Sequence, residues 1–320
     1  MQVLTPLLET RSLKKYFPTP SGRIHAVDGI SLSISKGQTL GVVGESGCGK
    51  STLGRTVLRL LEPDAGEILF EGESILGVDK RQARKKFKDM QIIFQDPYAS
   101  LNPRMTLSDI ILEPMKINKF LPTNKELDER VNELMEIVGL APRLYNAYPH
   151  ELDGGRRQRV GVARALALMP KFIVCDEPVS ALDVSIQAQI LNLMMDLQDK
   201  MDLTYMFITH NLSVVKHISD QIMVMYLGQC IELTSSDELF KNPLHPYTKA
   251  LLDAIPIPRL RTPGFKRKSI QGELTSPIDP PPGCRFAARC PYVTEACEGR
   301  DIPLREVEVN HKVACVLFDK

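Results

Sequence analysis

The sequence lacks a long hydrophobic run. No stretch of 18 uncharged apolar residues occurs in the 320 residues, whereas a membrane-spanning helix needs about 20 such residues. The opening MQVLTPLLETRSLKKYF places charges where the apolar centre of a signal peptide would stand. We therefore expect a soluble, intracellular protein with no membrane span of its own.

The chain also lacks an excess of charge of either sign. Forty basic residues against thirty-nine acidic ones leave a net charge of +1. Proteins that bind nucleic acid through bulk electrostatics carry a clear positive excess. Nucleic acid is therefore not an expected partner. The length is sufficient for one large domain or two ordinary ones with a sizeable core.

Cysteine is scarce until the last 37 residues, which hold four of the seven. Cys48, Cys175 and Cys230 each stand in an apolar or glycine-rich stretch, where buried packing is the expected role. Disulfides are not expected, because a cytosolic protein keeps its thiols reduced. The crowding at the end of the chain therefore needs another explanation.

Short apolar segments alternate with helical patterns along the chain. TLGVVG (39–44), KFIVCDEP (171–178) and TYMFITH (204–210) are typical of buried strands. Residues 124–140 repeat apolar side chains with a helical period and end at a glycine. This alternation predicts an α/β fold with a parallel sheet. We find no internal repeat.

GESGCGKS (44–51) follows the first of these strands and matches the phosphate-loop pattern G-x-x-x-x-G-K-[ST]. The glycines let backbone N–H groups turn toward phosphate oxygens, and the following helix adds a favourable dipole. Lys50 would reach the β- and γ-phosphates, and Ser51 would coordinate Mg²⁺. The motif predicts a nucleotide triphosphatase. The expected ATP-binding residues here are Gly44, Glu45, Ser46, Gly47, Cys48, Gly49, Lys50, Ser51 and Thr52.

Two carboxylates follow the buried strand in FIVCDEP. Asp176 would hold Mg²⁺ through water, and Glu177 would orient or deprotonate the attacking water. The alternative is that the acidic pair only caps a helix. The phosphate loop in the same chain makes this alternative the weaker one. His210 ends the third strand, at the edge where ligands bind in such sheets.

These motifs, with LDGGRRQR, SALD and ITH, occur in the order found in ATP-binding cassette (ABC) ATPases, which the chain resembles over roughly residues 8–255. The resemblance implies an ABC-type nucleotide-binding domain over residues 1–255. Such a domain has a parallel-sheet core, an antiparallel β subdomain and a helical subdomain, here at about 97–165.

The same resemblance implies roles for single residues. Tyr16 would stack on adenine, and Gln95 of the Q-loop would contact Mg²⁺ and sense the membrane partner. Asp183 of the D-loop would lie at a dimer interface. His210 would act as the switch histidine at the γ-phosphate. With Glu177, Gln95 and His210 form the expected catalytic set.

NPLHPYTKALLDAIP (242–256) and the cysteine-rich end resemble one branch of this family, the ATPase subunits of oligopeptide and dipeptide importers. This implies a second ATPase subunit, two integral membrane permease subunits and, indirectly, an extracytoplasmic solute-binding protein as partners. It also implies a peripheral position on the cytoplasmic face of the cell membrane. A soluble cassette ATPase with a regulatory role is the alternative.

The end of the chain differs in composition from the rest. Residues 256–283 are proline-rich and basic, which is typical of a solvated linker, with contact to an acidic membrane surface as the alternative. Residues 284–320 form a small cysteine-rich extension. Its cysteines lack the paired C-x₂₋₄-C knuckles of structural zinc sites. They are Cys284, Cys290, Cys297 and Cys315.

Four thiolates in a reduced compartment are the ligand set of a [4Fe–4S] cluster, and the resembling branch implies such a cluster here. Bound zinc and no metal at all remain open. His311 is expected to be a neighbour of this site and not a ligand. We expect a structural role for the cluster, because a short segment with little core gains folding energy from a bound metal.

LDGGRRQR departs from the family signature at two positions. Asp153 stands where the resemblance places a serine that contacts the γ-phosphate of the opposite subunit's ATP, and Arg156 replaces a glutamine. At ~4 Å and a dielectric constant of about 20, each pair of like unit charges costs roughly 4 kcal/mol. The intact Gly154 and Gly155 still allow close approach.

Two explanations of the aspartate remain. Asp153 caps the signature helix while Arg156 compensates its charge, or the ATP site that this signature completes is degenerate. We favour a weakened site. Because a homodimer would weaken both of its sites, this hypothesis favours a heterodimer with a non-identical ATPase.

Overall fold

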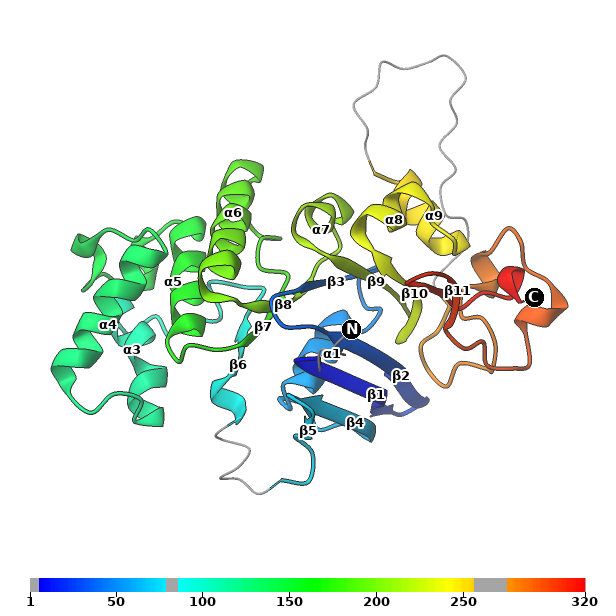
Figure 1. Cartoon of the computed structure of the whole chain (residues 1–320), viewed down its shortest axis with the longest axis horizontal. Coiled ribbons are helices and arrows are strands. Elements are labelled where there is room, and N and C mark those ends of the chain that lie inside the picture. Colours follow the sequence, from blue (N-terminus) through cyan, green and yellow to red (C-terminus); the bar gives the residue numbers. More distant parts are fainter. Residues whose placement is uncertain (1–5, 79–85, 256–274, 320) are drawn as a thin grey trace, which may run out of the picture. The chain divides into compact units, whose positions relative to one another are not determined.

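The computed structural model describes residues 6–78, 86–255 and 275–319. The chain divides into two compact units, whose elements are labelled in Figure 1. Unit 1 consists of Met1–Leu7, Ile34–Gln38 and Phe70–Ile208. Unit 2 consists of Leu8–Ser33, Thr39–Leu69 and Thr209–Lys320. Among the described residues, no helix is long and apolar enough to cross a membrane.

Unit 1 contains three parallel strands, β6 (Met90–Ile93), β7 (Phe172–Asp176) and β8 (Thr204–Ile208). Their order is β8-β7-β6. Every residue of β7 and β8 is buried, as the continuous apolar runs of parallel strands predict. Both segments predicted as buried parallel strands, 171–178 and 204–210, are therefore confirmed.

Four helices make up most of the rest of unit 1: α3 (Leu107–Asn118), α4 (Asn124–Ile137), α5 (Gly154–Leu166) and α6 (Val184–Met201). The signature helix α5 packs against the other three. α4 begins at a capping box in which Thr123 and Glu126 bond each other's backbone N–H groups. The short elements that the structure describes in unit 1 include β5 (Glu73–Ser74), η1 (Pro142–Leu144) and η2 (Pro149–Glu151).

The main sheet of unit 2 consists of β3 (Thr39–Val43), β9 (Gln221–Tyr226), β10 (Gln229–Ser235), β11 (Arg305–Glu308) and β12 (His311–Val313). The order is β11-β12-β10-β9-β3. β3 and β9 are parallel, and the other neighbours are antiparallel. All of β3 is buried, which confirms the strand predicted before the phosphate loop.

Unit 2 has a second group of strands in the order β2-β1-β4, namely β1 (Leu8–Thr19), β2 (Gly22–Ile34) and β4 (Ala65–Phe70). Its helices are α1 (Lys50–Val57), α7 (Leu212–Ile218), α8 (Ser236–Lys241) and α9 (Pro246–Asp253). α1 packs against β1, and α7 packs against β3. The strand before the phosphate loop and the helix after it are therefore both fixed within unit 2.

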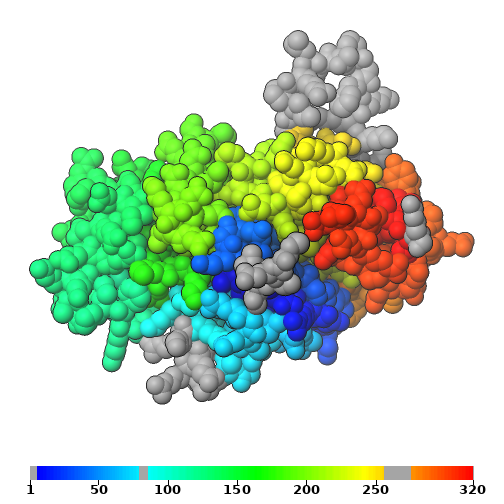
Figure 2. Space-filling model, viewed as in Figure 1, coloured from blue at the N-terminus to red at the C-terminus, as the bar shows by residue number. Residues whose placement is uncertain are grey.

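The C-terminal segment, residues 275–319, is built into unit 2. β12 pairs with β10, so that Glu232 lies opposite Val313. Phe286 is buried with its ring 5.4 Å from that of Tyr226 and 5.3 Å from that of Tyr247. Figure 2 shows the segment in orange and red, directly against the yellow surface of α8 and α9. The other elements of the segment are η3 (Ala287–Arg289), η4 (Glu295–Cys297) and η5 (Val316–Phe318).

Most of the predicted proline-rich linker, residues 256–274, lies outside the described residues. This includes its basic side chains, Arg259, Arg261, Lys266, Arg267 and Lys268. The linker therefore stays a prediction.

Candidate active site

The phosphate loop lies between β3 and α1, and its backbone requires glycine. Gly44, Gly47 and Gly49 have φ angles of 154°, 77° and 104°. A Cβ atom on Gly49 would lie 1.9 Å from the carbonyl oxygen of Ala26, and one on Gly44 would lie 2.2 Å from a backbone oxygen. Side chains are thus excluded, as a loop that brings its backbone close to phosphate demands. Gly49, the N-cap of α1, has no side chain to cap the helix, and a helix N-terminus of this kind favours an anion.

Lys50 is held over this loop by the loop's own carbonyl groups. Its side chain is buried, and Nζ donates to the oxygens of Gly44 and Glu45, each at 2.9 Å. The ammonium group is therefore fixed beside the backbone N–H groups that would face phosphate. Cys48 packs in the same loop, where burial raises the pKa of its thiol. Buried packing, predicted for Cys48 and Cys175, is confirmed, whereas Cys230 is only half-buried.

The C-terminal segment contacts the phosphate loop directly. Arg289 donates Nη1 to Oε2 of Glu45 at 2.8 Å and Nη2 to Oε1 at 3.0 Å. A bidentate arginine–carboxylate pair of this kind fixes geometry as well as charge. The Arg289 side chain is 7% exposed, and its hydrogen bond to Glu45 raises its pKa. On the other side, the backbone N–H of Glu45 donates to the hydroxyl of Tyr247 at 2.8 Å.

In unit 1, β6 and β7 bring together Gln95 and Glu177 of the expected catalytic set and the expected Mg²⁺ ligand Asp176. Asp176 ends β7 and is buried, and Glu177 follows it. Gln95, just after β6, donates Nε2 to Oε2 of Glu177 at 3.0 Å. Glu177 has a φ of 47°, an uncommon conformation for a residue other than glycine, and its N–H donates to Ile208. Such strain is typical of functional positions.

The signature region shows the cap that the sequence offered as one explanation. Asp153 is the N-cap of α5, where its Oδ1 accepts the backbone N–H of Arg156 at 2.8 Å. The Arg156 side chain returns to within 3.5 Å of Oδ2. A Cβ atom on Gly155 would lie 2.6 Å from Ile186, so this glycine allows α5 to approach α6. Asp183 caps α6 by accepting the N–H of Ile186.

The chain matches two family models. The model described as "ABC transporter" matches residues 27–180, and "Oligopeptide/dipeptide transporter, C-terminal region" matches residues 231–297. Oligopeptide transport ATP-binding protein AppF of Bacillus subtilis is 52% identical over 322 residues, covering 98% of this chain and 97% of AppF. The chain belongs to the oligopeptide transporter family of ABC ATPases.

Further relatives agree with this assignment. OppF of Bacillus subtilis is also an oligopeptide transport ATP-binding protein, 52% identical over 97% of this chain and 96% of its own. Among solved structures, cbiO1 of Clostridium perfringens has a TM-score of 0.66 and 28% identity, covering 74% of this chain and 92% of that one. The dimeric cassette MJ0796, bound to ADP and Pi, has a TM-score of 0.65 and 26% identity, covering 72% and 98%. The predicted ABC fold is confirmed.

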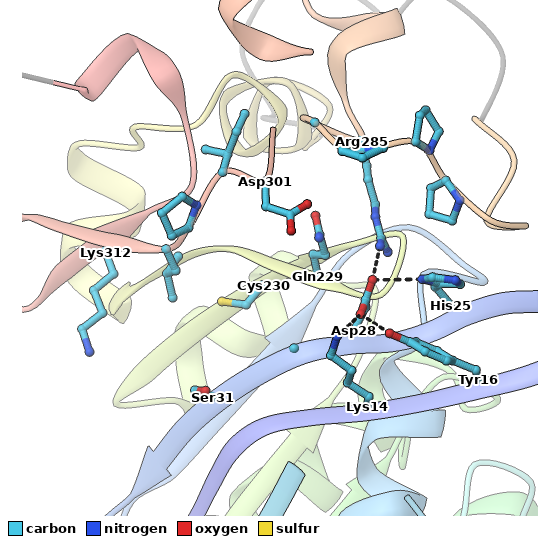
Figure 3. Close-up of a pocket in the computed structure, with 18 of the residues that line it drawn as sticks. Lys14, Tyr16, His25, Asp28, Ser31, Gln229, Cys230, Arg285, Asp301 and Lys312 are labelled. Atoms are coloured by element: carbon cyan, nitrogen blue, oxygen red, sulfur yellow. Dashed lines mark hydrogen bonds and ion pairs between the residues drawn. The ribbon is translucent and has the colours of Figure 1, made fainter. Parts of the chain in front are cut away.

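Tyr16, predicted to stack on adenine in this ABC ATPase, takes part in a different network (Figure 3). Its hydroxyl donates to Asp28 at 2.5 Å, and its ring stacks on His25 with 4.2 Å between centroids. Arg285 of the C-terminal segment also pairs with Asp28. Burial alone would raise the pKa of Asp28, but hydrogen bonds from Tyr16, His25 and Arg285 outweigh it and lower this pKa to about 2.

These side chains line a cavity of about 590 Å³ between β1, β2, β10 and the C-terminal segment. None of its described lining residues belongs to the phosphate loop. Because side chains alternate along a strand, the next residue, Phe17, faces the other side of β1. The adenine role of Tyr16 stays a prediction, and Phe17 is a second aromatic candidate that the sequence reasoning missed.

The four cysteines of residues 284–320 lie in one neighbourhood. Burial, and to a smaller extent the neighbouring thiols of Cys297, Cys315 and Cys290, raise the pKa of Cys284 to about 11. Such neighbours ionise together only when a cation compensates their charge, as metal binding does. Sulfurs on one zinc ion, each about 2.3 Å from it, would lie within about 4 Å of one another. Among the described residues, no three cysteine sulfurs lie within 4.8 Å of one another.

The cysteine spacing therefore disagrees with one shared zinc ion. Four thiols are the donor set of an iron–sulfur cluster, but the described sulfurs show no cluster arrangement.

Proposed function

We propose that the chain is the ATP-hydrolysing subunit that powers an importer of peptides or related solutes. One observation carries the proposal. A phosphate loop with a buried Lys50 and a peptide-transporter C-terminal region occur in one chain, and Arg289 of that region bonds Glu45 of the loop. The identity to AppF and OppF supports the same function. A soluble ATPase with a regulatory role is the alternative.

Each group of the site has its own task in hydrolysis. The backbone N–H groups of the loop and Lys50 bind the phosphates of ATP. Ser51 and Gln95 would supply oxygens to Mg²⁺, and Asp176 would hold the ion through water. Glu177 orients the attacking water, and its bond to Gln95 fixes the carboxylate before ATP arrives. His210 contacts the γ-phosphate.

The ATPase acts with partners at the cytoplasmic face of the cell membrane. They are a second, non-identical ATPase subunit, two integral membrane permease subunits and, indirectly, an extracytoplasmic solute-binding protein. The dimeric cassette MJ0796 supports pairing, and the Asp153 signature favours a partner that differs from this chain. Residues 1–255 form the ATPase domain, 256–283 a linker and 284–320 the cysteine-rich region.

Cys284, Cys290, Cys297 and Cys315 hold a [4Fe–4S] cluster with a structural role. The cluster supplies positive charge that keeps the four thiolates ionised. The cluster stabilises the segment that carries Arg289, the neighbour of Cys290. Arg289 in turn bonds the phosphate loop. Anaerobically purified protein should be brown and contain about four irons per chain. Colourless protein with a single zinc ion bound by cysteine would overturn this part of the proposal.

Co-purification tests the transport function. The chain is expressed with the permease subunits of its own cell membrane, and the complex is isolated in detergent. A transport subunit remains bound to integral membrane proteins, and their addition changes its ATPase rate. A chain that hydrolyses ATP yet binds no membrane protein under these conditions is the regulatory ATPase instead.

A further inference from the structure

A buried histidine in unit 2 has one nitrogen without a partner. His311, the first residue of β12, is fully buried. Its Nε2 lies 2.8 Å from Oε1 of Glu232, which is also fully buried. Its Nδ1 has no hydrogen-bond partner among the described residues. A buried nitrogen of this kind costs free energy unless something binds it.

The environment of Glu232 determines which nitrogen is free for a ligand. The Glu232 carboxylate accepts the backbone N–H groups of Leu244 and His245, and its Oε1 lies 2.8 Å from Nε2 of His311. Nε2 is therefore occupied by Glu232, and Nδ1 is the ring nitrogen left for a ligand. Metal-binding histidines have this arrangement, in which a carboxylate holds the nitrogen opposite the metal.

Two further carboxylates complete the group. Glu238 of α8, Glu308 of β11 and His311 each place one ligand atom within 4.8 Å of the others. It is the one group of this kind among the residues that the structure describes. Within that part of the chain, Glu232 is the one carboxylate within 4.0 Å of the His311 ring. Glu238 and Glu308 are therefore too far away for an ion pair with the ring, and close enough for shared coordination of an ion.

The fold holds these ligands without help from an ion. Glu308 lies opposite His311 in the β11–β12 hairpin, and Asn242 donates to its Oε2 at 3.2 Å. Glu238 lies in the first turn of α8, which packs against β10. β10 carries Glu232 and pairs with β12. α8 and the β11–β12 hairpin therefore both adjoin β10. Figure 1 labels α8, β10 and β11 in this region.

We propose that Glu238, Glu308 and His311 bind a divalent transition-metal ion, with water completing its coordination. One imidazole and two carboxylates suit Zn²⁺, whose protein ligands include both types. Mg²⁺ and Ca²⁺ prefer oxygen ligands alone, and an imidazole therefore disfavours them. None of the four cysteines is a ligand, so the ion is distinct from the proposed cluster.

The ion links the C-terminal hairpin to the body of unit 2. Glu308 and His311 belong to the β11–β12 hairpin, which pairs with β10 through β12. Glu238 belongs to α8, which packs against β10. An ion that binds only this docked arrangement stabilises it. The same C-terminal segment carries Arg289, which bonds Glu45 of the phosphate loop. Zinc binding therefore stabilises the segment that contacts this loop.

The test is zinc titration of full-length protein that keeps its proposed cluster and is freed of other metal ions, followed by calorimetry and by the thermal unfolding midpoint. We expect one zinc ion per chain at this site and a rise in the midpoint. Glu238→Gln and Glu308→Gln should each weaken binding at least tenfold and abolish the rise. Glu306→Gln is the matched control, because Glu306 is exposed on the same strand and outside the ligand group. This control should bind like the wild type.

Co²⁺ in place of Zn²⁺ identifies the donors. A site of one nitrogen and carboxylate oxygens gives weak visible bands, whereas thiolates add intense charge-transfer bands in the near ultraviolet. Weak bands that disappear in Glu308→Gln support the proposal. Thiolate bands at the first equivalent, equal affinity in wild type and Glu308→Gln, or no zinc uptake by the wild type would each overturn it.

Discussion

At the scale of single residues, the sequence identified chemistry wherever a motif is contiguous. The phosphate loop could be predicted, because its glycines, Lys50 and Ser51 stand within eight residues. The Arg289–Glu45 pair could not, since 244 positions separate the partners. Tyr16 shows a third case. The distance in sequence between Tyr16 and the phosphate loop does not show which face of strand β1 carries the Tyr16 side chain.

Asp153 gives the first prediction. Asp153→Ser should leave helix α5 stable to within about 0.5 kcal/mol, because serine caps a helix about as well as aspartate. It should raise hydrolysis at the partner's phosphate loop, because a carboxylate that repels phosphate is removed. The measurement is the ATPase rate of the assembled complex with this chain's own site silenced. A lower rate would show that the carboxylate works in the site.

The adenine contact gives the second prediction. Phe17→Ala should weaken ATP binding by about 1–3 kcal/mol, the typical loss when an aromatic side chain that stacks on a base is removed. Tyr16→Phe keeps the ring and removes only the hydroxyl that Asp28 accepts, so it should bind ATP like the wild type. Equilibrium binding of ATP and of GTP to each variant makes the comparison. A larger loss in Tyr16→Ala than in Phe17→Ala would assign the adenine contact to Tyr16, as the sequence predicts.

At the scale of elements, local patterns predicted the strands and helices well. β3, β7 and β8 were recognised because parallel strands have continuous apolar runs. The C-terminal segment was harder, because its short strands and turns have no periodic pattern. Its place in unit 2 depends on the β10–β12 pairing and on Phe286, which packs with tyrosines far away in sequence.

The Arg289–Glu45 link gives a prediction about this segment. Arg289→Ala should lower the free energy of unfolding by about 1.5–3 kcal/mol, because a bidentate, largely buried pair with a charged group is lost. It should also weaken ATP binding, since Glu45 loses the contact that positions the loop. Urea unfolding and ATP titration measure the two effects.

Arg300→Ala is the matched control. Arg300 pairs with Asp319 in the same segment, but its side chain is 55% exposed. Its removal should change stability by less than about 1 kcal/mol and leave ATP affinity unchanged. Equal effects of the two substitutions would contradict a specific role for the Arg289 link.

At the scale of the whole molecule, the order of motifs predicted the family and therefore the ATPase activity. The partners of the chain could be inferred only from its resemblance to known ATPases, because the surfaces that contact partners carry no contiguous motif. The signature belongs to a site that another subunit completes, and for that reason the sequence left two explanations of Asp153. The structure adds the cap and the Arg156 contact to this question.

Glu177→Gln in the assembled importer, reconstituted in vesicles, tests the central claim most directly. The substitution preserves size and removes the carboxylate that orients water, while leaving Lys50 and the loop to bind ATP. Phosphate release at this chain's site and uptake of a labelled peptide mixture are measured together with bound nucleotide. We predict that hydrolysis and uptake both fall at least a hundredfold, while ATP stays bound and the ATPase dimer stays closed. Hydrolysis and uptake at the wild-type rate in this variant would contradict the account.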